Sequence, residues 1–133
     1  MKRALVAMLL VLLSCAASNA SDKRRPAAAD LVGNWEGTSI CQVKPSPCHD
    51  EHVILRLSHP QRDKINVQAD KIVDSKPVTM GVDDWRYDDA SHALIYELPR
   101  GTWRLLVDEN DMSGTLVTTG NIVFRKVHLH RVR

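Results

Sequence analysis

The sequence predicts an all-β domain, an antiparallel up-and-down meander of about eight short strands that closes into a small barrel. Three observations predict this class. Apolar and polar residues alternate with a period of two through most of the chain after residue 20. Clusters of turn-forming residues recur about every ten residues, and no segment after residue 20 has a helical apolar period. Short connections favour pairing of each strand with the next, and closure removes exposed strand edges.

The chain of 133 residues begins with a segment that has the features of an export signal. Residues 1–20 combine Lys2 and Arg3 with an apolar run from Ala4 to Leu13, and they end in the small residues Ser18-Asn19-Ala20. The run is shorter than the roughly 20 residues that a membrane-spanning helix needs. We therefore expect cleavage after Ala20 and an exported protein, either periplasmic or secreted.

A second processing route stays open at Cys15. The segment LLSC, which ends at Cys15, resembles the lipobox of bacterial lipoproteins, in which the cysteine is acylated and becomes the first residue. The resemblance implies an outer-membrane lipoprotein. Contact with a membrane is expected only through this route.

Removal of residues 1–20 also removes the net charge of the chain. These residues hold two of the eighteen Lys and Arg and none of the sixteen Asp and Glu, so the remainder has a formal net charge of zero. Without a positive field, the domain is a poor partner for nucleic acid. Residues 21–30 lack apolar periodicity and are expected to be a linker, which leaves residues 31–133 as a single β-barrel domain.

The first two expected strands flank a pair of cysteines. Cys41 ends the strand-like segment LVGNWEGTSIC, and Cys48 precedes the alternating segment HVILRLS, with QVKPSP between the two cysteines. Facing residues of an antiparallel pair lie about 4.5–5.5 Å apart at Cα, which is within disulfide range. Closing so short a loop is worth only about 2–2.5 kcal/mol. We expect a disulfide whose main use is to fix strand register, since the spacing is not that of a redox Cys-x-x-Cys pair.

The remaining strands are expected where alternation recurs between turn signals. The turn signals are SHPQRDK, DSKP, YDDASH, LPRGT, DENDMSG and TTGN. The residues that share one face of each expected strand are Val53, Leu55 and Leu57; Ile65, Val67 and Ala69; Leu94, Tyr96 and Leu98; Trp103, Leu105 and Val107; and Val123, Arg125, Val127 and Leu129.

Gly33-Asn34-Trp35 stands at the head of the first expected strand. A Gly-x-Trp in this place, followed by an all-β meander of this length, resembles small bacterial members of the calycin group, which includes the lipocalins and avidins. The resemblance implies that Trp35 closes the floor of a lipocalin-like barrel beneath a basic residue of the last strand. Arg125 is the best positional match for that residue, and Arg131 is the next. A guanidinium over an indole ring contributes roughly 0.5–2 kcal/mol.

Metal binding and catalysis have weak signals. The densest polar run, CHDEH, contains His49 and His52, and His128 and His130 project from one face of the last strand. Such groups ligate zinc, but His49 and His52 are three apart at the start of a strand and therefore point to opposite faces. We expect no metal site and no cofactor. The expected domain has no free cysteine and no Gly-x-Ser-x-Gly, phosphate-loop or His-Glu-x-x-His motif, so we expect no catalytic residues and no enzyme.

Aromatic residues are the best candidates for contact with a ligand or partner: Trp85, Tyr87, Tyr96 and Trp103. The acidic surroundings of Trp85 in VDDWRYDD indicate that this ring is partly exposed. The sequence favours a non-catalytic binding barrel for a small apolar or amphipathic ligand. The alternative is a protein-interaction module, such as a periplasmic inhibitor of a secreted hydrolase, which would present the loop QVKPSP. Small exported bacterial β-barrels with a disulfide include inhibitors of this kind.

Overall fold

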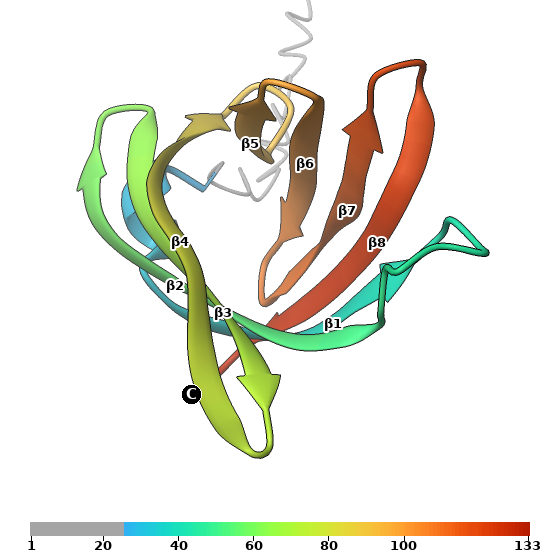
Figure 1. Ribbon diagram of the computed structural model, residues 1–133. Helices are drawn as coiled ribbons and strands as arrows, with labels where there is room; N and C mark the ends of the chain where they lie inside the picture. Colours follow the sequence, from blue (N-terminus) through green and yellow to red (C-terminus); the bar gives the residue numbers. More distant parts are fainter. Residues whose placement is uncertain (1–25) are drawn as a thin grey trace, which may run out of the picture.

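The computed structural model describes residues 26–133, which form a closed barrel of eight antiparallel strands in sequential order (Figure 1). The strands are β1 (Gly33–Cys41), β2 (Glu51–Gln61), β3 (Lys64–Val73), β4 (Lys76–Asp88), β5 (Ala93–Leu98), β6 (Gly101–Asp108), β7 (Asp111–Thr118) and β8 (Ile122–Arg131). β8 pairs back onto β1, which closes the barrel. The all-β meander that the sequence predicts is confirmed. The expected signal peptide, Cys15 and residues 21–25 of the expected linker lie outside the described residues.

Local sequence explains both the strands and the turns between them. Val53, Leu55 and Leu57 of β2 are buried, while the residues between them are more exposed, as expected for a strand with one face toward a core. The turn between β3 and β4 consists of Asp74 and Ser75, both with positive φ, which is the backbone that tight hairpins require. Polar turn residues of this kind therefore set where each strand reverses.

The disulfide joins Cys41 and Cys48, whose Cα atoms are 5.9 Å apart. Cys41 is the last residue of β1, and β2 begins at Glu51, so the bond closes the loop between these strands as predicted. The backbone N–H of Cys41 also donates to Oδ1 of Asp50 at 2.9 Å. The loop is therefore attached to the barrel at both of its ends.

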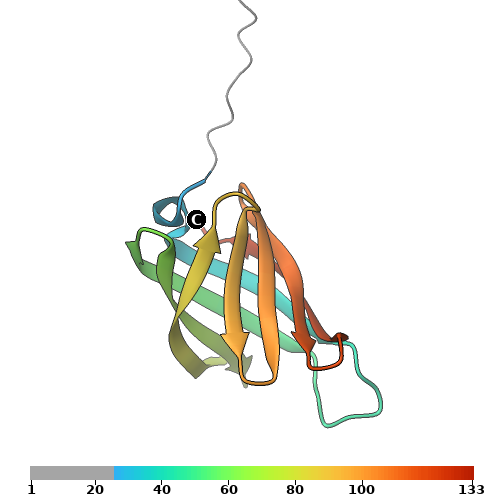
Figure 2. The ribbon, with the colours of Figure 1, turned by 90° about the horizontal axis from the view of Figure 1, so that it is seen from above.

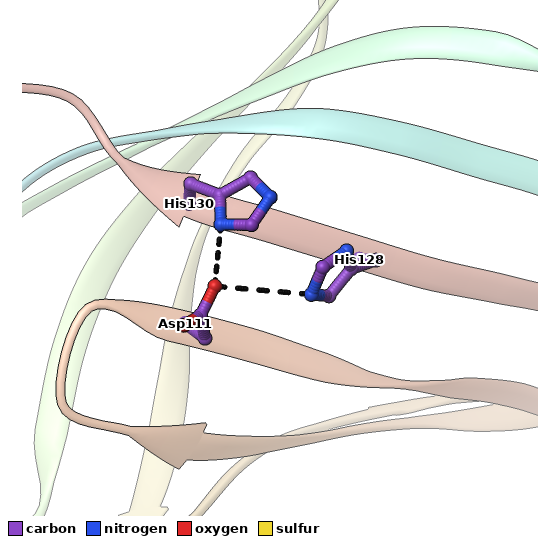
Figure 3. A group of neighbouring side chains, drawn as sticks. All are labelled: Asp111, His128 and His130. Atoms are coloured by element: carbon purple, nitrogen blue, oxygen red, sulfur yellow. Dashed lines mark ion pairs between the residues drawn. The ribbon is translucent and has the colours of Figure 1, made fainter.

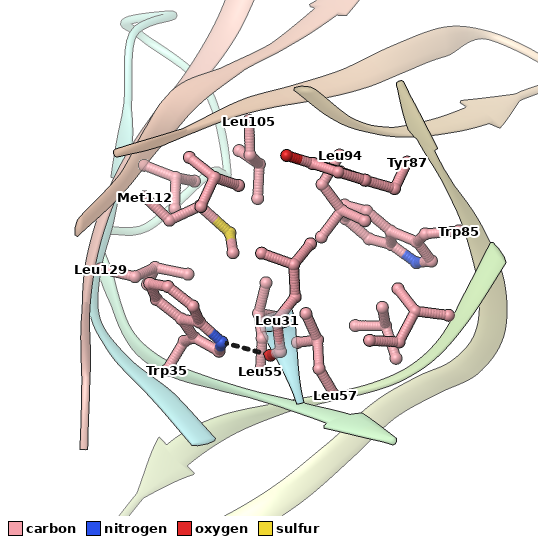
Figure 4. Packing of buried hydrophobic residues seen from close by; sticks show 14 of the residues in the cluster. Leu31, Trp35, Leu55, Leu57, Trp85, Tyr87, Leu94, Leu105, Met112 and Leu129 are labelled. Atoms are coloured by element: carbon pink, nitrogen blue, oxygen red, sulfur yellow. Dashed lines mark hydrogen bonds between the residues drawn. The ribbon is translucent and has the colours of Figure 1, made fainter. Parts of the chain in front are cut away.

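One end of the barrel is closed by packed side chains (Figure 4). A short 3-10 helix, η1 (Ala28–Leu31), leads into β1 and buries Ala28 and Leu31 against the barrel residues. The indole N–H of Trp35 donates to the carbonyl oxygen of Leu31 at 3.0 Å, and Trp35 has no exposed surface. The assignment of residues 28–30 to a linker was wrong, because they form η1 and Ala28 packs against the core at the barrel floor.

The cation over Trp35 is Arg131, and the preference for Arg125 was wrong. The guanidinium carbon of Arg131 lies 4.3 Å from the Trp35 ring centroid. Its two terminal nitrogens donate to the carbonyl oxygens of Val32 at 2.8 Å and Asp30 at 2.6 Å. The reason is register: Trp35 pairs with Arg131 across β1 and β8, whereas Arg125 pairs with Cys41 at the opposite end of β1.

Gly33 makes this floor compatible with the backbone that enters β1. Its φ is +134°, a conformation that side chains rarely adopt, and a Cβ there would lie 3.4 Å from a guanidinium nitrogen of Arg131. The Gly-x-Trp pair therefore has two linked uses. Gly33 permits the turn into β1, and Trp35 fills the floor beneath Arg131.

Few residues pair between β4 and β5 in the barrel wall. These strands pair only where Arg86 to Asp88 face Ala93 to Ile95. The longer part of β4, from Lys76 to Trp85, pairs only with β3. This stretch of β4 is therefore a strand edge that no described residue pairs with on its β5 side.

The overhanging part of β4 is anchored to β3 by a buried carboxylate. Asp70 lies at a register shift between β3 and β4 and is 1% exposed. It accepts hydrogen bonds from Nε of Arg56 at 2.9 Å, Nε2 of Gln68 at 3.0 Å and Oγ1 of Thr79 at 2.8 Å. Burial on its own raises the pKa of Asp70, but these hydrogen bonds and the Arg56 charge together lower that pKa below its ordinary value.

Among the described residues, no helix is both long and apolar enough to cross a membrane. The two views place η1 at one end of the barrel and the loop between β1 and β2 beyond the other end (Figure 2).

Candidate ligand-binding cavity

The barrel encloses a cavity of ≈ 380 Å³ at the end opposite the Trp35 floor. This volume falls within the range of small-molecule sites, roughly 300–1,000 Å³. Seven of the eight strands contribute to the wall, and most of the lining side chains are apolar. The lining residues are Ser39, Glu51, Val53, Leu55, Val67, Ala69, Met80, Gly81, Asp83, Trp85, Tyr96, Leu98, Trp103, Leu105, Arg125 and Val127.

Aromatic rings line the side of the cavity where the pairing between β4 and β5 ends. Trp85 of β4 and Tyr96 of β5 stack with centroids 5.2 Å apart and planes 12° from parallel. Trp103 of β6 is the register partner of Tyr96. The stack joins β4 to β5 just beyond the last backbone pair between them, so side chains close the wall where the ladder ends.

Two expectations about the aromatic residues were wrong. Trp85 is only 6% exposed, because the alternation of β4 turns it inward while its acidic neighbour Asp84 points outward. Tyr87 does not line the cavity. It lies two residues further along β4, among the packed residues of the closed end, and burial and the negative charges of Asp89, Asp30 and Asp88 raise its pKa.

A charged cluster stands at the open end of the cavity. The side chain of Arg125 is 13% exposed, and Nη1 donates to Oγ of Ser39 at 3.1 Å and lies 3.5 Å from Oε2 of Glu51. Nζ of Lys71 is 3.6 Å from the other Glu51 oxygen. Glu51 begins β2 and Arg125 pairs with the last residue of β1, so these charges lie at the rim. The deeper wall is apolar.

A second polar contact lies at the opening between β4 and β5. Tyr96 and Asp83 both line the cavity there, with the carboxylate of Asp83 near the Tyr96 hydroxyl. Burial, followed by the Asp83 carboxylate and its negative charge, raises the pKa of Tyr96.

The serine in the cavity lining is already paired with a neighbouring side chain. Among the lining residues described, there is one serine and no histidine or cysteine, and the serine hydroxyl is held by Arg125 rather than by a general base. The polar residues of the run CHDEH do not gather at one site. Glu51 lines the cavity, whereas Nε2 of His52 contacts Glu36 at 2.7 Å on the outer wall and His49 is exposed in the loop.

The fold and cavity define a class: a closed, eight-stranded antiparallel β-barrel with an apolar pocket open at one end, an arrangement consistent with a lipocalin-like fold. No protein-family model and no curated protein matches the sequence.

Proposed function

We propose that this protein is an exported, non-catalytic binding protein that holds a small apolar or amphipathic molecule in the barrel cavity. The observation that carries the proposal is the asymmetry of the core. One end is filled by fully buried side chains such as Trp35, Met112 and Leu129, whereas the other end keeps an accessible apolar space.

The distribution of polar groups supports an amphipathic ligand. An apolar part would lie against Leu55, Val67 and Leu105, where the wall offers no charge. A polar part would reach the rim, where Arg125 and Glu51 provide a donor and an acceptor. The disulfide is compatible with export to an oxidising compartment, which supports the location.

Fluorescence titration tests the proposal. Trp85 and Trp103 line the cavity, so a ligand there should change the tryptophan emission. Anilinonaphthalene sulfonate and decanoic acid are suitable amphipathic probes. We expect a saturable change at one probe per chain, and the two probes should compete.

A pair of matched variants locates the binding. Ala69→Phe adds an aromatic ring inside the cavity, whereas Leu106→Phe adds one to the outer face of β6, where Leu106 is 50% exposed. Ala69→Phe should weaken probe binding by about tenfold or more, and Leu106→Phe should leave it unchanged. Equal affinities for both variants, or no saturable change with the unaltered protein, would contradict the proposal.

A second candidate function, inhibition of a secreted hydrolase, is favoured by the loop between β1 and β2. It projects beyond the barrel (Figure 2), and Lys44, Pro45 and Pro47 are exposed. Ser46 fixes its shape by donating to the carbonyl oxygen of Val43 at 2.8 Å and accepting from the N–H of Cys48 at 3.1 Å. Inhibition of lysozyme or a secreted protease that is lost in Lys44→Glu, with probe binding unchanged, would support this function.

A further inference from the structure

The outer wall carries a cluster of two histidines and one carboxylate, separate from the cavity (Figure 3). His128 and His130 are two residues apart on β8, and Val127 and Leu129, which alternate with them, are buried in the barrel. Both imidazoles therefore leave the same outer face. Asp111, the first residue of β7, is the register partner of His130.

The donor atoms of this cluster converge on one point. Oδ1 of Asp111 contacts Nδ1 of His130 and lies 3.8 Å from Nε2 of His128. All three donor atoms are within 4.8 Å of one another. Donors of a tetrahedral zinc site, with bonds of 2.0–2.2 Å, are separated by about 3.4 Å. Small side-chain rotations are enough to reach that arrangement, since each of these side chains is more than half exposed.

The two imidazole rings meet edge to face. Their centroids are 4.6 Å apart and their planes meet at 77°, so the rings are not stacked face to face and their nitrogens are free to point inward together. Glu36 of β1 is the register partner of His130 on its other side, but its carboxylate contacts Nε2 of His52 and is not part of the cluster. Asp111 is therefore the carboxylate in contact with His130.

We propose that Asp111, His128 and His130 form a surface site for a divalent transition metal of the zinc class. Two imidazole nitrogens and one carboxylate oxygen are borderline ligands that suit Zn²⁺ and, by the same chemistry, Cu²⁺ and Ni²⁺. Three protein ligands leave the fourth position of the ion to water. The ion would join β7 to β8 beside the hairpin between β6 and β7, and it would stabilise the folded barrel by mass action.

Zinc titration of the purified protein, prepared without a histidine tag, tests the proposal. Competition with a chromophoric chelator should give one Zn²⁺ per chain with a dissociation constant in the micromolar range. The double variant His128→Ala, His130→Ala should show no binding below ~1 mM Zn²⁺. Asp111→Asn should weaken binding by about tenfold, because an amide is a poorer ligand than a carboxylate.

His52→Ala is the matched control. His52 is also an exposed imidazole on the outer wall in contact with a carboxylate, and its side chain is 49% exposed. This variant should bind zinc as the unaltered protein does. All four substituted positions are on the surface, so each variant should fold. Circular dichroism of each variant checks this.

A spectroscopic readout identifies the ligands directly. Long-range ¹H–¹⁵N spectra should show zinc-induced shifts at Nε2 of His128 and Nδ1 of His130. Zinc-induced shifts confined to His49, His52 or His59, zinc binding that survives the double variant, or no binding below ~1 mM would each overturn the proposal.

Discussion

Removal of Arg131 should destabilise the barrel through its floor. The guanidinium covers Trp35 at 4.3 Å and donates to the carbonyl oxygens of Val32 and Asp30. A partly exposed cation–π contact contributes about 0.5–1 kcal/mol. Each hydrogen bond from the charged donor adds about 1 kcal/mol once its exposure to water is taken into account. Arg131→Ala should therefore lower the free energy of unfolding by about 2–3 kcal/mol.

Urea denaturation followed by tryptophan fluorescence measures this loss. Arg133→Ala is the control, because Arg133 is exposed two residues further along and should change the free energy by less than about 0.5 kcal/mol. Arg131→Lys keeps the charge but not the planar fork that spans two carbonyl oxygens, and it should recover only part of the loss.

The indole N–H resonance of Trp35 reports on the same contact. It should shift in Arg131→Ala, because Arg131 holds the carbonyl oxygens on either side of Leu31, which accepts the indole hydrogen bond. It should not shift in Arg125→Ala, since Arg125 lies at the other end of β1. A stability loss no larger than that of Arg133→Ala, or a Trp35 shift in Arg125→Ala alone, would refute the reasoning.

Three further predictions concern positions in the barrel wall. Asp70→Asn removes the charge that faces Arg56 and should cost about 1–3 kcal/mol at pH 7. The folded-state pKa of Asp70 is lowered, so its contribution to stability is present above the unfolded pKa of about 3.9 and is lost as the pH falls through the folded value. In urea denaturation, the stability difference between the variant and the parent should therefore shrink below about pH 4. A difference that stays constant there would count against the ion pair. Tyr87→Phe removes a buried hydroxyl that has no hydrogen-bond partner among residues 26–133, and thermal denaturation should show it as stable as the parent or up to about 1 kcal/mol more stable, whereas a clear loss would reveal a missed partner. Gly114→Ala would place a Cβ 1.9 Å from the carbonyl oxygen of Arg104 and should cost about 2 kcal/mol or more by the same measurement, so an unchanged midpoint would contradict the close approach of β6 and β7.

The strands and the disulfide could be predicted because their signals are local. Alternation shows which residues share a face, and turn residues show where the chain reverses. Asp74 and Ser75, for example, lie in a turn signal and adopt the positive φ of a tight hairpin. The short spacing of Cys41 and Cys48 likewise marks the two ends of one loop.

The errors arose where long-range register decides. Arg125 and Arg131 share one face of the last strand, so alternation alone does not choose between them. The pairing of β1 with β8 places Arg131 opposite Trp35 and Arg125 at the far end of β1. Trp85 has acidic neighbours, but they include a residue on the opposite face of β4. Burial of Ala28 and Leu31 follows from contact with the finished barrel, and four residues carry no period that could reveal it.

The candidate metal cluster shows the same limit. His128 and His130 could be found from their spacing, but Asp111 is far from them in the sequence, and the register of β7 on β8 brings it to them. The cavity also depends on closure. Met80, Gly81 and Asp83 line it because β4 overhangs β5, and nothing in the sequence shows how few residues pair there.

Chemical-shift mapping with a bound amphipathic probe tests the central claim most directly. Decanoic acid in the cavity should shift the indole resonances of Trp85 and Trp103 and the amide resonance of Val127. It should leave the indole resonance of Trp35 and the amide resonance of Leu31, at the packed floor, unchanged. Shifts confined to the outer wall or the loop between β1 and β2, or no saturable shift at all, would contradict a ligand-binding barrel.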